Sequence, residues 1–232
     1  MRYAFPVPNV PSVAVAGSDD HFPVHRIYCV GRNYADHARE MGVDPEREPP
    51  FFFAKPADAV VASGARVPYP LATKNLHHEI ELVVAIGASG VSLSAEAAPR
   101  LIWGYAVGLD MTRRDLQNDM REKKRPWDIG KSFAQAAPIG PLHPVSAVGQ
   151  LSRGKIWLDV NGMRRQAGDL ADMIWDVPHT LAFLSKYYEL LPGDLVFTGT
   201  PAGVGAVVAG DRLNGGIDGL GTLAITVGPP LG

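Results

Sequence analysis

The stretch of sequence that decides the fold runs from residue 77 to residue 86 and reads HHEIELVVAI. Its aliphatic and β-branched residues, with turn-forming residues on both sides, predict a buried strand. Residues 104–111 read GYAVGLDM and predict a second core strand in the same way. Because side chains alternate along a strand, Glu79 and Glu81 are expected on one face and Ile80 on the other.

Short strands are expected over much of the rest of the chain. Asn161-Gly162 predicts a type I′ hairpin that joins residues 155–160 to residues 163–166. Residues 194–227 alternate apolar runs with glycines, which predicts strands joined by tight turns. Further strands are predicted at residues 12–16, 26–30 and 51–53, the last of them as a buried strand after a polar loop.

Three modest helices are predicted. The first covers residues 33–41 with Asn33 as its N-cap. The second directly follows the second core strand, because Thr112 and Asp115 have the spacing of a capping box. The third covers residues 178–191, and its core-facing stripe is expected to consist of Leu181, Leu184, Tyr188 and Leu191. Since these helices do not alternate regularly with the strands, the predicted fold class is α+β, mostly β.

Composition restricts the function classes. The chain has 232 residues with 46% hydrophobic and 20% charged residues, as expected for one globular domain. A net charge of -2 argues against nucleic acid as a partner. Cys29 is the only cysteine, so an intramolecular disulfide is impossible and a reducing cytoplasm is expected. No segment approaches the ~18 uninterrupted apolar residues of a membrane helix, so no membrane association is expected.

Three carboxylates form the strongest candidate site. Glu79 and Glu81 on one strand face could simply be solvated, but the strand continues with apolar residues on both faces and therefore predicts an interior position. Asp110 ends the other core strand, and three carboxylates are suitable ligands for Mg²⁺ or Mn²⁺. His77 and His78 are adjacent and face opposite sides of a strand, which makes zinc the weaker interpretation.

Two further groups have both a structural and a functional interpretation. His37 and Glu40 lie three residues apart on the first helix, either as a solvated surface pair or as an imidazole oriented by a carboxylate for general base catalysis. The basic run at residues 121–125 is either a solvated helix end or an anion-binding rim, with Lys131 reaching inward behind it. The glycine-rich residues 199–205 lack a Walker lysine but have N–H groups suited to a substrate carboxylate.

Taken together and in order, five motifs resemble the fumarylacetoacetate hydrolase family in its small acylpyruvase-like branch. The resemblance covers residues 26–232 as the catalytic domain and leaves residues 1–25 as an N-terminal extension. It implies a mixed β-sandwich roll with short helices, usually a homodimer. The motifs are GRNYADH at residues 31–37, NLHHEIEL at 75–82, GLDMT at 108–112, GKSF at 130–133 and GTPAGVG at 199–205.

The resemblance also implies roles for single residues. Glu79, Glu81 and Asp110 match the family's metal ligands, with Mg²⁺ or Mn²⁺ as the usual ion. His37 and Glu40 match its lid dyad, which favours the catalytic interpretation of that pair and makes residues 33–50 a candidate lid. Lys131, Gln117 and Thr200 match its site lysine, glutamine and threonine; Lys131 is expected to be catalytic as well as substrate-binding, and Arg32 and Arg114 are expected to bind substrate too.

The implied activity is hydrolysis of a C–C bond in a small 2,4-dioxo or dicarboxylic acid. Residues 51–56 and 121–131 most resemble the family members that cleave fumarylpyruvate to fumarate and pyruvate in gentisate-type aromatic degradation, so this substrate is expected. For the far carboxylate of that substrate the expected partners are Arg114, Lys124 and Arg125. The motifs leave open a general acylpyruvase, an oxaloacetate decarboxylase or an isomerase of the same family, and a non-catalytic β-rich metal-binding module.

Overall fold

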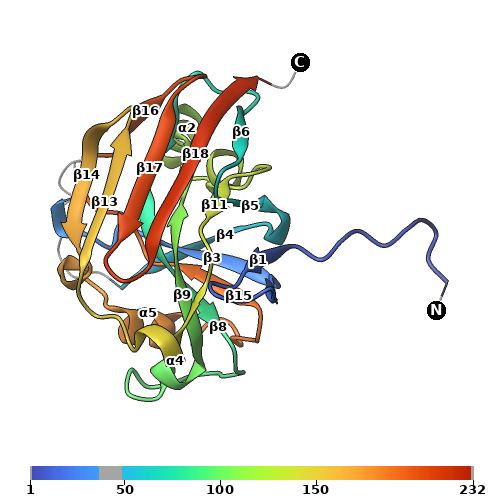
Figure 1. Ribbon diagram of the computed structural model, residues 1–232, viewed down its shortest axis with the longest axis vertical. Coiled ribbons are helices and arrows are strands. Elements are labelled where there is room, and N and C mark those ends of the chain that lie inside the picture. Colours follow the sequence, from blue (N-terminus) through green and yellow to red (C-terminus); the bar gives the residue numbers. More distant parts are fainter. Residues whose placement is uncertain (1, 37–48, 231–232) are drawn as a thin grey trace.

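The computed structural model describes residues 2–36 and 49–230. Strands dominate these ranges, and the helices are few and short, as predicted for a mostly β member of the α+β class (Figure 1). Two curled sheets form most of the molecule, and two smaller ones extend them. No helix in the described ranges is long and apolar enough to cross a membrane.

The larger sheet contains both predicted core strands. Its central strand, β8, pairs antiparallel with β9 on one side and with β15 on the other, while β15 is parallel to β3, so the sheet is mixed. In spatial order the strands are β4 (Phe51–Lys55), β3 (Arg26–Gly31), β15 (Asp194–Phe197), β8 (Ile80–Ile86), β9 (Ile102–Leu109), β11 (Ala137–Ile139) and β5 (Val60–Ala62), and β12 (His143–Pro144) also pairs with β9.

The second sheet packs against this one. It stands upright on the left of Figure 1, where its red and orange strands lie beside each other. Its strands, in spatial order, are β14 (Met163–Asp169), β13 (Lys155–Val160), β17 (Arg212–Ile217), β18 (Gly221–Pro230) and β6 (Arg66–Tyr69). A Cβ at Gly215 of β17 would lie 2.8 Å from Ile80 Cδ1 of β8, so this close approach between the sheets requires glycine.

The remaining elements are small. One three-stranded sheet has the order β10 (Thr112–Arg113), β7 (Leu76–His78) and β16 (Gly205–Val207), and β1 (Ser12–Ala14) pairs with β2 (His21–Pro23). The α-helices are α2 (Arg114–Glu122), α3 (Asp128–Lys131), α4 (Val145–Val148) and α5 (Val177–Leu184). Three 3₁₀ helices are η1 (Ala57–Ala59), η2 (Ala98–Leu101) and η3 (Leu170–Asp172).

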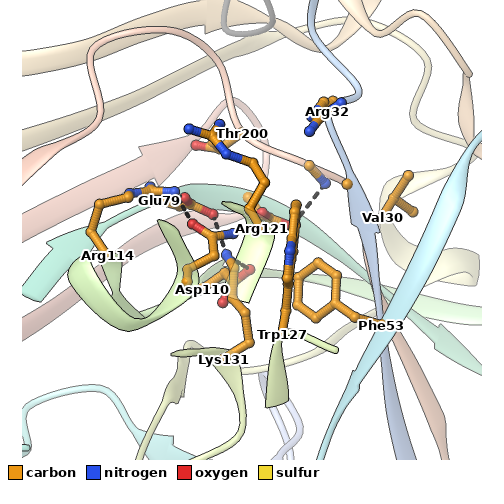
Figure 2. Close-up of a pocket in the computed structure, with 14 residues that line it drawn as sticks. Val30, Arg32, Phe53, Glu79, Asp110, Arg114, Arg121, Trp127, Lys131 and Thr200 are labelled. Carbon is orange, nitrogen blue, oxygen red and sulfur yellow. Dashed lines mark hydrogen bonds and ion pairs between the residues drawn. The ribbon is translucent and has the colours of Figure 1, made fainter. Parts of the chain in front are cut away.

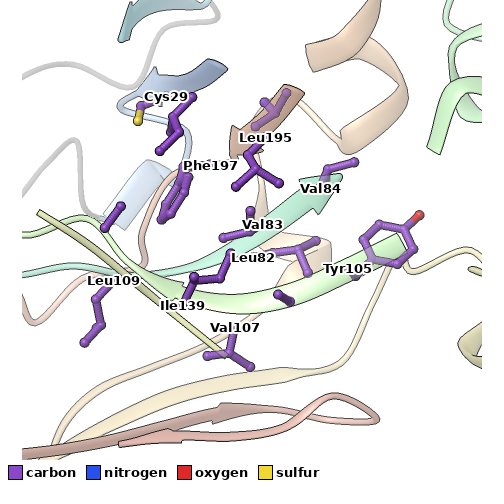
Figure 3. Packing of buried hydrophobic residues seen from close by; sticks show 14 of the residues in the cluster. Cys29, Leu82, Val83, Val84, Tyr105, Val107, Leu109, Ile139, Leu195 and Phe197 are labelled. Atoms are coloured by element: carbon purple, nitrogen blue, oxygen red, sulfur yellow. The ribbon is translucent and has the colours of Figure 1, made fainter. Parts of the chain in front are cut away.

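The hydrophobic core lies along β8 and its neighbours. Every residue of β8 is buried, and Figure 3 shows Leu82 and Val83 packed among side chains of β9 and β15. Removing a Val or Leu side chain from water contributes about 1.5–3 kcal/mol, so this strand supplies a large share of the driving force for folding. Cys29 is buried in the same cluster, and burial raises the pKa of its thiol well above the usual value.

Several sequence predictions are confirmed. The hairpin forms between β13 and β14, with positive φ angles at Asn161 (53°) and Gly162 (80°) as a type I′ turn requires. The stretch at residues 77–86 is extended, although it is divided at Glu79 into β7 and β8. The tail contains β15 to β18, and the expected strands at residues 12–16, 26–30 and 51–53 correspond to β1, β3 and β4.

Other predictions are wrong in detail. The helix expected over residues 178–191 ends at Leu184, and Tyr188, expected in the core, is 45% exposed. After Leu184, the N–H groups of Lys186 and Tyr187 donate to carbonyls three residues back, so the chain leaves the α-helix in a tighter turn, and the Ser185 hydroxyl accepts from Leu93 N of another segment. Phe51 at the start of β4 is exposed, since β4 is an edge strand of which only Lys55 is buried.

The predicted capping box is also wrong. The side chain of Thr112 does not cap α2 but donates to Asp110 O, 3.0 Å away. Asp115 instead accepts from Thr73 Oγ1 at 2.5 Å and from Lys74 N at 2.9 Å. Asn33, expected as an N-cap, uses its amide to bind Trp175 O and Thr198 O, both at 2.8 Å. The helix expected to follow Asn33 lies mostly outside the described residues, and the division of the chain at residue 25 stays a prediction.

Candidate active site

Two antiparallel strands bring the three predicted carboxylates together. Glu81 lies on β8, Glu79 lies in the break between β7 and β8, and Asp110 directly follows β9. The register pairs Glu81 with Gly108, and Asp110 N donates to Glu79 O at 2.8 Å. As a result the three carboxylates offer oxygen atoms that all lie within 4.8 Å of one another, and all three residues are buried.

Lys131 lies at the centre of this cluster. Its Nζ is 2.7 Å from Glu79 Oε2, 2.6 Å from Asp110 Oδ2 and 2.8 Å from Thr112 Oγ1. Figure 2 shows the Lys131 side chain directed toward these two carboxylates. Burial works against the charged form of Lys131, but the two carboxylates outweigh it, so the pKa of the ammonium is raised. Lys131 is therefore a fixed positive charge.

Two more buried cations complete the surroundings. Lys55, at the end of β4, places its Nζ 2.8 Å from Asp110 Oδ1 and 3.2 Å from Met111 O, and it also donates to Lys131 O. Arg114, at the start of α2, donates to Glu79 Oε1. From the sequence, Lys55 contributed only to the resemblance at residues 51–56, and this last residue of the edge strand β4 was given no role in the site.

Glu81 differs from the other two carboxylates. Within the ranges that the structure describes, no Lys or Arg forms an ion pair with it, and its Oε2 accepts from Gly199 N at 2.8 Å. Burial, followed by the nearby charges of Asp110 and Glu79, raises the pKa of its carboxyl group well above the usual value. A cation bound among the three carboxylates would relieve this penalty, so the donor set fits a hard divalent metal ion.

A pocket opens above the carboxylates. Trp127 and Phe53 line it beside the charged cluster, with their ring centroids 5.9 Å apart (Figure 2). The combination of a polar base and an aromatic wall suits a small conjugated acid. The full lining consists of Val30, Gly31, Arg32, Phe53, Glu79, Glu81, Asp110, Arg114, Gln117, Arg121, Trp127, Lys131, Gly199 and Thr200.

All expected substrate-binding residues line this pocket: Arg32, Arg114, Gln117, Lys131 and Thr200. Gln117 and Arg114 form one face of α2, and Arg114 Nη1 donates to Gln117 Oε1. Helix α3 packs closely on this face, since a Cβ at Gly130 would lie 2.9 Å from Gln117 Cα. The glycine of α3 therefore positions both Gln117 and the neighbouring Lys131.

In the basic run at residues 121–125, one cation lines the pocket and the others face solvent. Arg121 lines the pocket and is half-buried, whereas Lys124 and Arg125 are exposed and do not line it. Arg114, the third cation expected to meet a far carboxylate, instead binds Glu79 next to the metal ligands. From the sequence, Arg121 was included in the possible anion-binding rim at residues 121–125 but was not singled out, although it follows Arg114 and Gln117 by seven and four residues and so lies on the same helix face.

The expected catalytic dyad, His37 and Glu40, lies outside the described residues, as does most of the candidate lid at residues 33–50. The chain enters this segment from a well-anchored position. Asn33 is buried, and its Oδ1 accepts from Trp175 N at 2.7 Å. Gly199 on the neighbouring loop has φ +96°, and a Cβ there would lie 2.7 Å from Asn33 Cβ, so the two segments approach as closely as glycine permits.

Comparison with known proteins agrees with this arrangement. A family model described as fumarylacetoacetate (FAA) hydrolase C-terminal matches residues 26–228. A fumarylpyruvate hydrolase from Ralstonia sp is 48% identical over 187 residues, which are 81% of this chain and 97% of that protein. The human mitochondrial oxaloacetate tautomerase FAHD1 is 41% identical over 204 residues, or 88% of this chain and 92% of that one.

Solved structures give the same relationship. The crystal structure of fumarylpyruvate hydrolase from Pseudomonas aeruginosa in complex with Mn²⁺ and pyruvate has a TM-score of 0.96 and 57% sequence identity, covering 98% of this chain and 100% of that chain. A structure described as a putative fumarylpyruvate hydrolase from Burkholderia cenocepacia has a TM-score of 0.94 and 51% identity, covering 100% and 96%. On its fold, its carboxylate cluster and these relatives, the chain belongs to the fumarylacetoacetate hydrolase family.

Proposed function

We propose that the chain is a metal-dependent hydrolase that cleaves fumarylpyruvate to fumarate and pyruvate. The observation that carries this proposal is the buried cluster of Glu79, Glu81 and Asp110 at the base of a pocket with aromatic and cationic walls. It is supported by the two relatives of 48% and 57% identity that are named fumarylpyruvate hydrolases, one of them in complex with Mn²⁺ and pyruvate.

Glu79, Glu81 and Asp110 would hold the metal ion, which we propose to be Mg²⁺ or Mn²⁺. Their oxygen donors suit either ion. When bound, the ion supplies stabilisation of negative charge on an enolate oxygen of the substrate. Lys131 and Arg114 keep Glu79 oriented through its two oxygens, while Lys131 and Lys55 do the same for Asp110. The protein therefore supplies ligands that are already fixed in place.

The remaining pocket groups act on the substrate. Gln117 accepts from Arg114 through Oε1, which leaves its Nε2 hydrogens to donate to a substrate oxygen. The Lys131 ammonium provides positive charge beside the reacting carbonyl groups. Arg121 is the cation we assign to the far carboxylate, because it lines the pocket and makes no ion pair with another described residue. These contacts would orient the acid with its pyruvyl end at the carboxylate cluster.

In the proposed reaction His37, oriented by Glu40, takes a proton from water. The water oxygen then bonds to the carbonyl carbon of the fumaryl group, and the bond from that carbon to the pyruvyl methylene breaks. The bonding electrons pass into the pyruvate enolate, which takes up a proton at carbon to give pyruvate. The other product is fumarate. Closure of residues 33–50 would bring His37 to the pocket and exclude bulk water.

Oxaloacetate chemistry is the second candidate, since the human relative of 41% identity is named an oxaloacetate tautomerase. Oxaloacetate shares the 2-oxo acid group and also carries a second carboxylate, so the same pocket groups suit it. A homodimer, a role in aromatic degradation and a cytoplasmic location belong to the proposal as well. The apolar side chains of Tyr3, Phe5, Val7 and Val10, exposed in the single chain, support an assembly of more than one copy.

The test is an absorbance assay of the purified protein with Mg²⁺ or Mn²⁺ against fumarylpyruvate, acetylpyruvate and oxaloacetate. We expect turnover of fumarylpyruvate with the highest kcat/KM. Efficient conversion of oxaloacetate alone would favour the second candidate. Bound metal without turnover of any of the three would favour the non-catalytic metal-binding module. Light scattering of the same sample measures the oligomeric state.

A further inference from the structure

Gln166 on β14 is fully buried and lies behind the pocket, yet it joins two parts of the site. Its Oε1 accepts from Ile80 N at 3.1 Å and from His78 Nδ1 at 2.9 Å. Its Nε2 donates to Thr200 Oγ1 and to Pro201 O, both at 2.8 Å. Ile80 separates two of the proposed metal ligands, and Thr200 lines the pocket. One amide group thus connects the metal-ligand strand to the loop on the other side of the pocket.

The orientation of this amide group follows from its partners. Ile80 N can only donate, so it must face the oxygen of Gln166, and Pro201 O can only accept, so it must face the nitrogen. Both contacts require the same orientation, and a flipped amide would leave both backbone groups without a partner. His78 Nδ1 must then carry its hydrogen, because the oxygen of Gln166 has none to donate.

This orientation determines the direction of the Thr200 hydroxyl. Because Gln166 Nε2 donates to Thr200 Oγ1, the hydroxyl hydrogen of Thr200 cannot point back at Gln166. Thr200 is 2% exposed and lines the pocket, and in the described part of the chain its hydroxyl donates to no other residue. Its O–H is therefore available to an acceptor inside the pocket.

We propose that Gln166 is a positioning residue that makes Thr200 a hydrogen-bond donor toward an anionic oxygen of the substrate. This inference rests on the proposed function to the extent that an anionic acid occupies the pocket. It also explains why a glutamine stands at a fully buried position on a strand whose exposed neighbours face solvent. A glutamate there would accept from Ile80 and His78 equally well, but it would offer no hydrogen to Thr200.

The experiment is a double-mutant cycle of Gln166→Glu and Thr200→Val, read by the dissociation constant of oxalate for the Mn²⁺-loaded protein. Oxalate is a planar dianion that resembles the enolate of pyruvate. Each single change should weaken binding roughly tenfold to a hundredfold, because a hydrogen bond to a charged group is lost. When Gln166→Glu is added to Thr200→Val, the dissociation constant of oxalate should rise by less than about threefold. The hydroxyl group that Gln166→Glu would redirect is already absent from that variant.

Two controls separate this role from a structural one. Gln150 is an exposed glutamine that accepts from the Tyr105 hydroxyl and donates to Pro99 O. Gln150→Glu makes the same chemical change away from the pocket, so oxalate affinity should not change. Thr200→Ser retains the hydroxyl and should retain affinity. The proposal is overturned if Gln166→Glu weakens oxalate binding by the same factor in the wild type and in Thr200→Val. It is also overturned if Thr200→Val binds oxalate as tightly as the wild type does.

Should Gln166→Glu not fold, neutron diffraction of wild-type crystals exchanged into D₂O decides the matter without that variant. We expect deuterium on Gln166 Nε2 facing Thr200 and the Thr200 hydroxyl deuterium directed into the pocket. A Thr200 deuterium directed at Gln166 would overturn the proposal. The outcome is independent of turnover, so a wild type that binds oxalate by this network but cleaves none of the three candidate acids would contradict only the proposed function.

Discussion

Lys55 Nζ lies 2.8 Å from Asp110 Oδ1, and both side chains are almost completely shielded from solvent. Lys55 comes from an edge strand and Asp110 directly follows the inner strand β9, so the pair ties the edge of the sheet to the metal ligands. Lys55 also donates to Lys131 O and thereby holds the backbone of α3 in place.

The first prediction concerns this pair. Lys55→Met should lower the free energy of unfolding by about 3–5 kcal/mol, because it leaves one oxygen of a buried carboxylate without its cation. Urea denaturation measures the change. Lys123→Met is the matched control, since Lys123 pairs with Asp119 on the exposed face of α2 and should change stability by less than about 1 kcal/mol. Equal, small effects of both substitutions would contradict the assigned role of Lys55.

Substitution of Glu81 should weaken metal binding without destabilising the metal-free protein. Exhaustive chelation should abolish activity, and Mg²⁺ or Mn²⁺ should restore it. Glu81→Gln should remain at least as stable as the wild type without metal, because an amide replaces a buried carboxylate that forms no ion pair with a Lys or Arg in the described part of the chain. The variant should lose most of the rise in melting temperature that Mn²⁺ produces in the wild type. Full activity after chelation would contradict the prediction.

Stability of the metal-free protein should also depend on pH through Glu81. Burial raises the pKa of its carboxyl group above the ordinary 4.5, so the folded state holds this proton more tightly than the unfolded state. The contribution is therefore fully present below pH 4.5 and is lost as the pH rises through the raised pKa. In chelator, wild type should lose stability relative to Glu81→Gln as the pH increases. A difference that does not change with pH would argue against this assignment.

The dyad prediction rests on the sequence, because His37 lies outside the described residues. His37→Ala should lower kcat for hydrolysis by roughly 10²-fold or more while Mn²⁺ affinity is retained, since the imidazole is expected to act on water and not on the metal. Single-turnover assays and Mn²⁺ titration measure the two quantities. His21→Ala, on the exposed β1–β2 hairpin, is the control. Near-normal turnover of His37→Ala would return the pair to a solvated surface role.

Local patterns were sufficient to predict the carboxylate cluster. Alternation along a strand placed Glu79 and Glu81 together, and the end of the next core strand placed Asp110 near them. The Asn161-Gly162 hairpin was predictable for a similar reason, because the positive φ angles of its turn suit these two residue types. In each case the determining interaction lies within a few residues or between neighbouring strands.

The groups that surround the cluster could not be predicted in this way. Lys55 and Gln166 reach the site from β4 and β14, whose neighbours in the sequence carry no signal of what lies across the fold. Just after the end of α5, the Ser185 hydroxyl accepts a hydrogen bond from Leu93 N, which is 92 residues away in the sequence. Tertiary contacts of this kind override local helix propensity.

Substrate choice should depend on Arg121. Fumarylpyruvate has a far carboxylate that acetylpyruvate lacks, and Arg121 is the residue of the basic run at residues 121–125 that lines the pocket. A charge-assisted hydrogen bond contributes about 1.5–3 kcal/mol, so Arg121→Gln should lower kcat/KM for fumarylpyruvate by roughly one to two powers of ten. The value for acetylpyruvate should change little, because that substrate offers no partner to the lost guanidinium group.

Lys124→Gln provides the matched comparison, since Lys124 belongs to the same basic run but is exposed and outside the pocket lining. It removes the same unit of charge, so any effect of the general electrostatic field on an anionic substrate appears in both variants, whereas a direct contact appears only in Arg121→Gln. The ratio of kcat/KM for the two substrates should therefore fall in Arg121→Gln and stay constant in Lys124→Gln. Wild type could instead convert acetylpyruvate as efficiently as fumarylpyruvate, with a ratio that neither substitution changes. In that case the pocket does not bind the far carboxylate, and the enzyme is a general acylpyruvase.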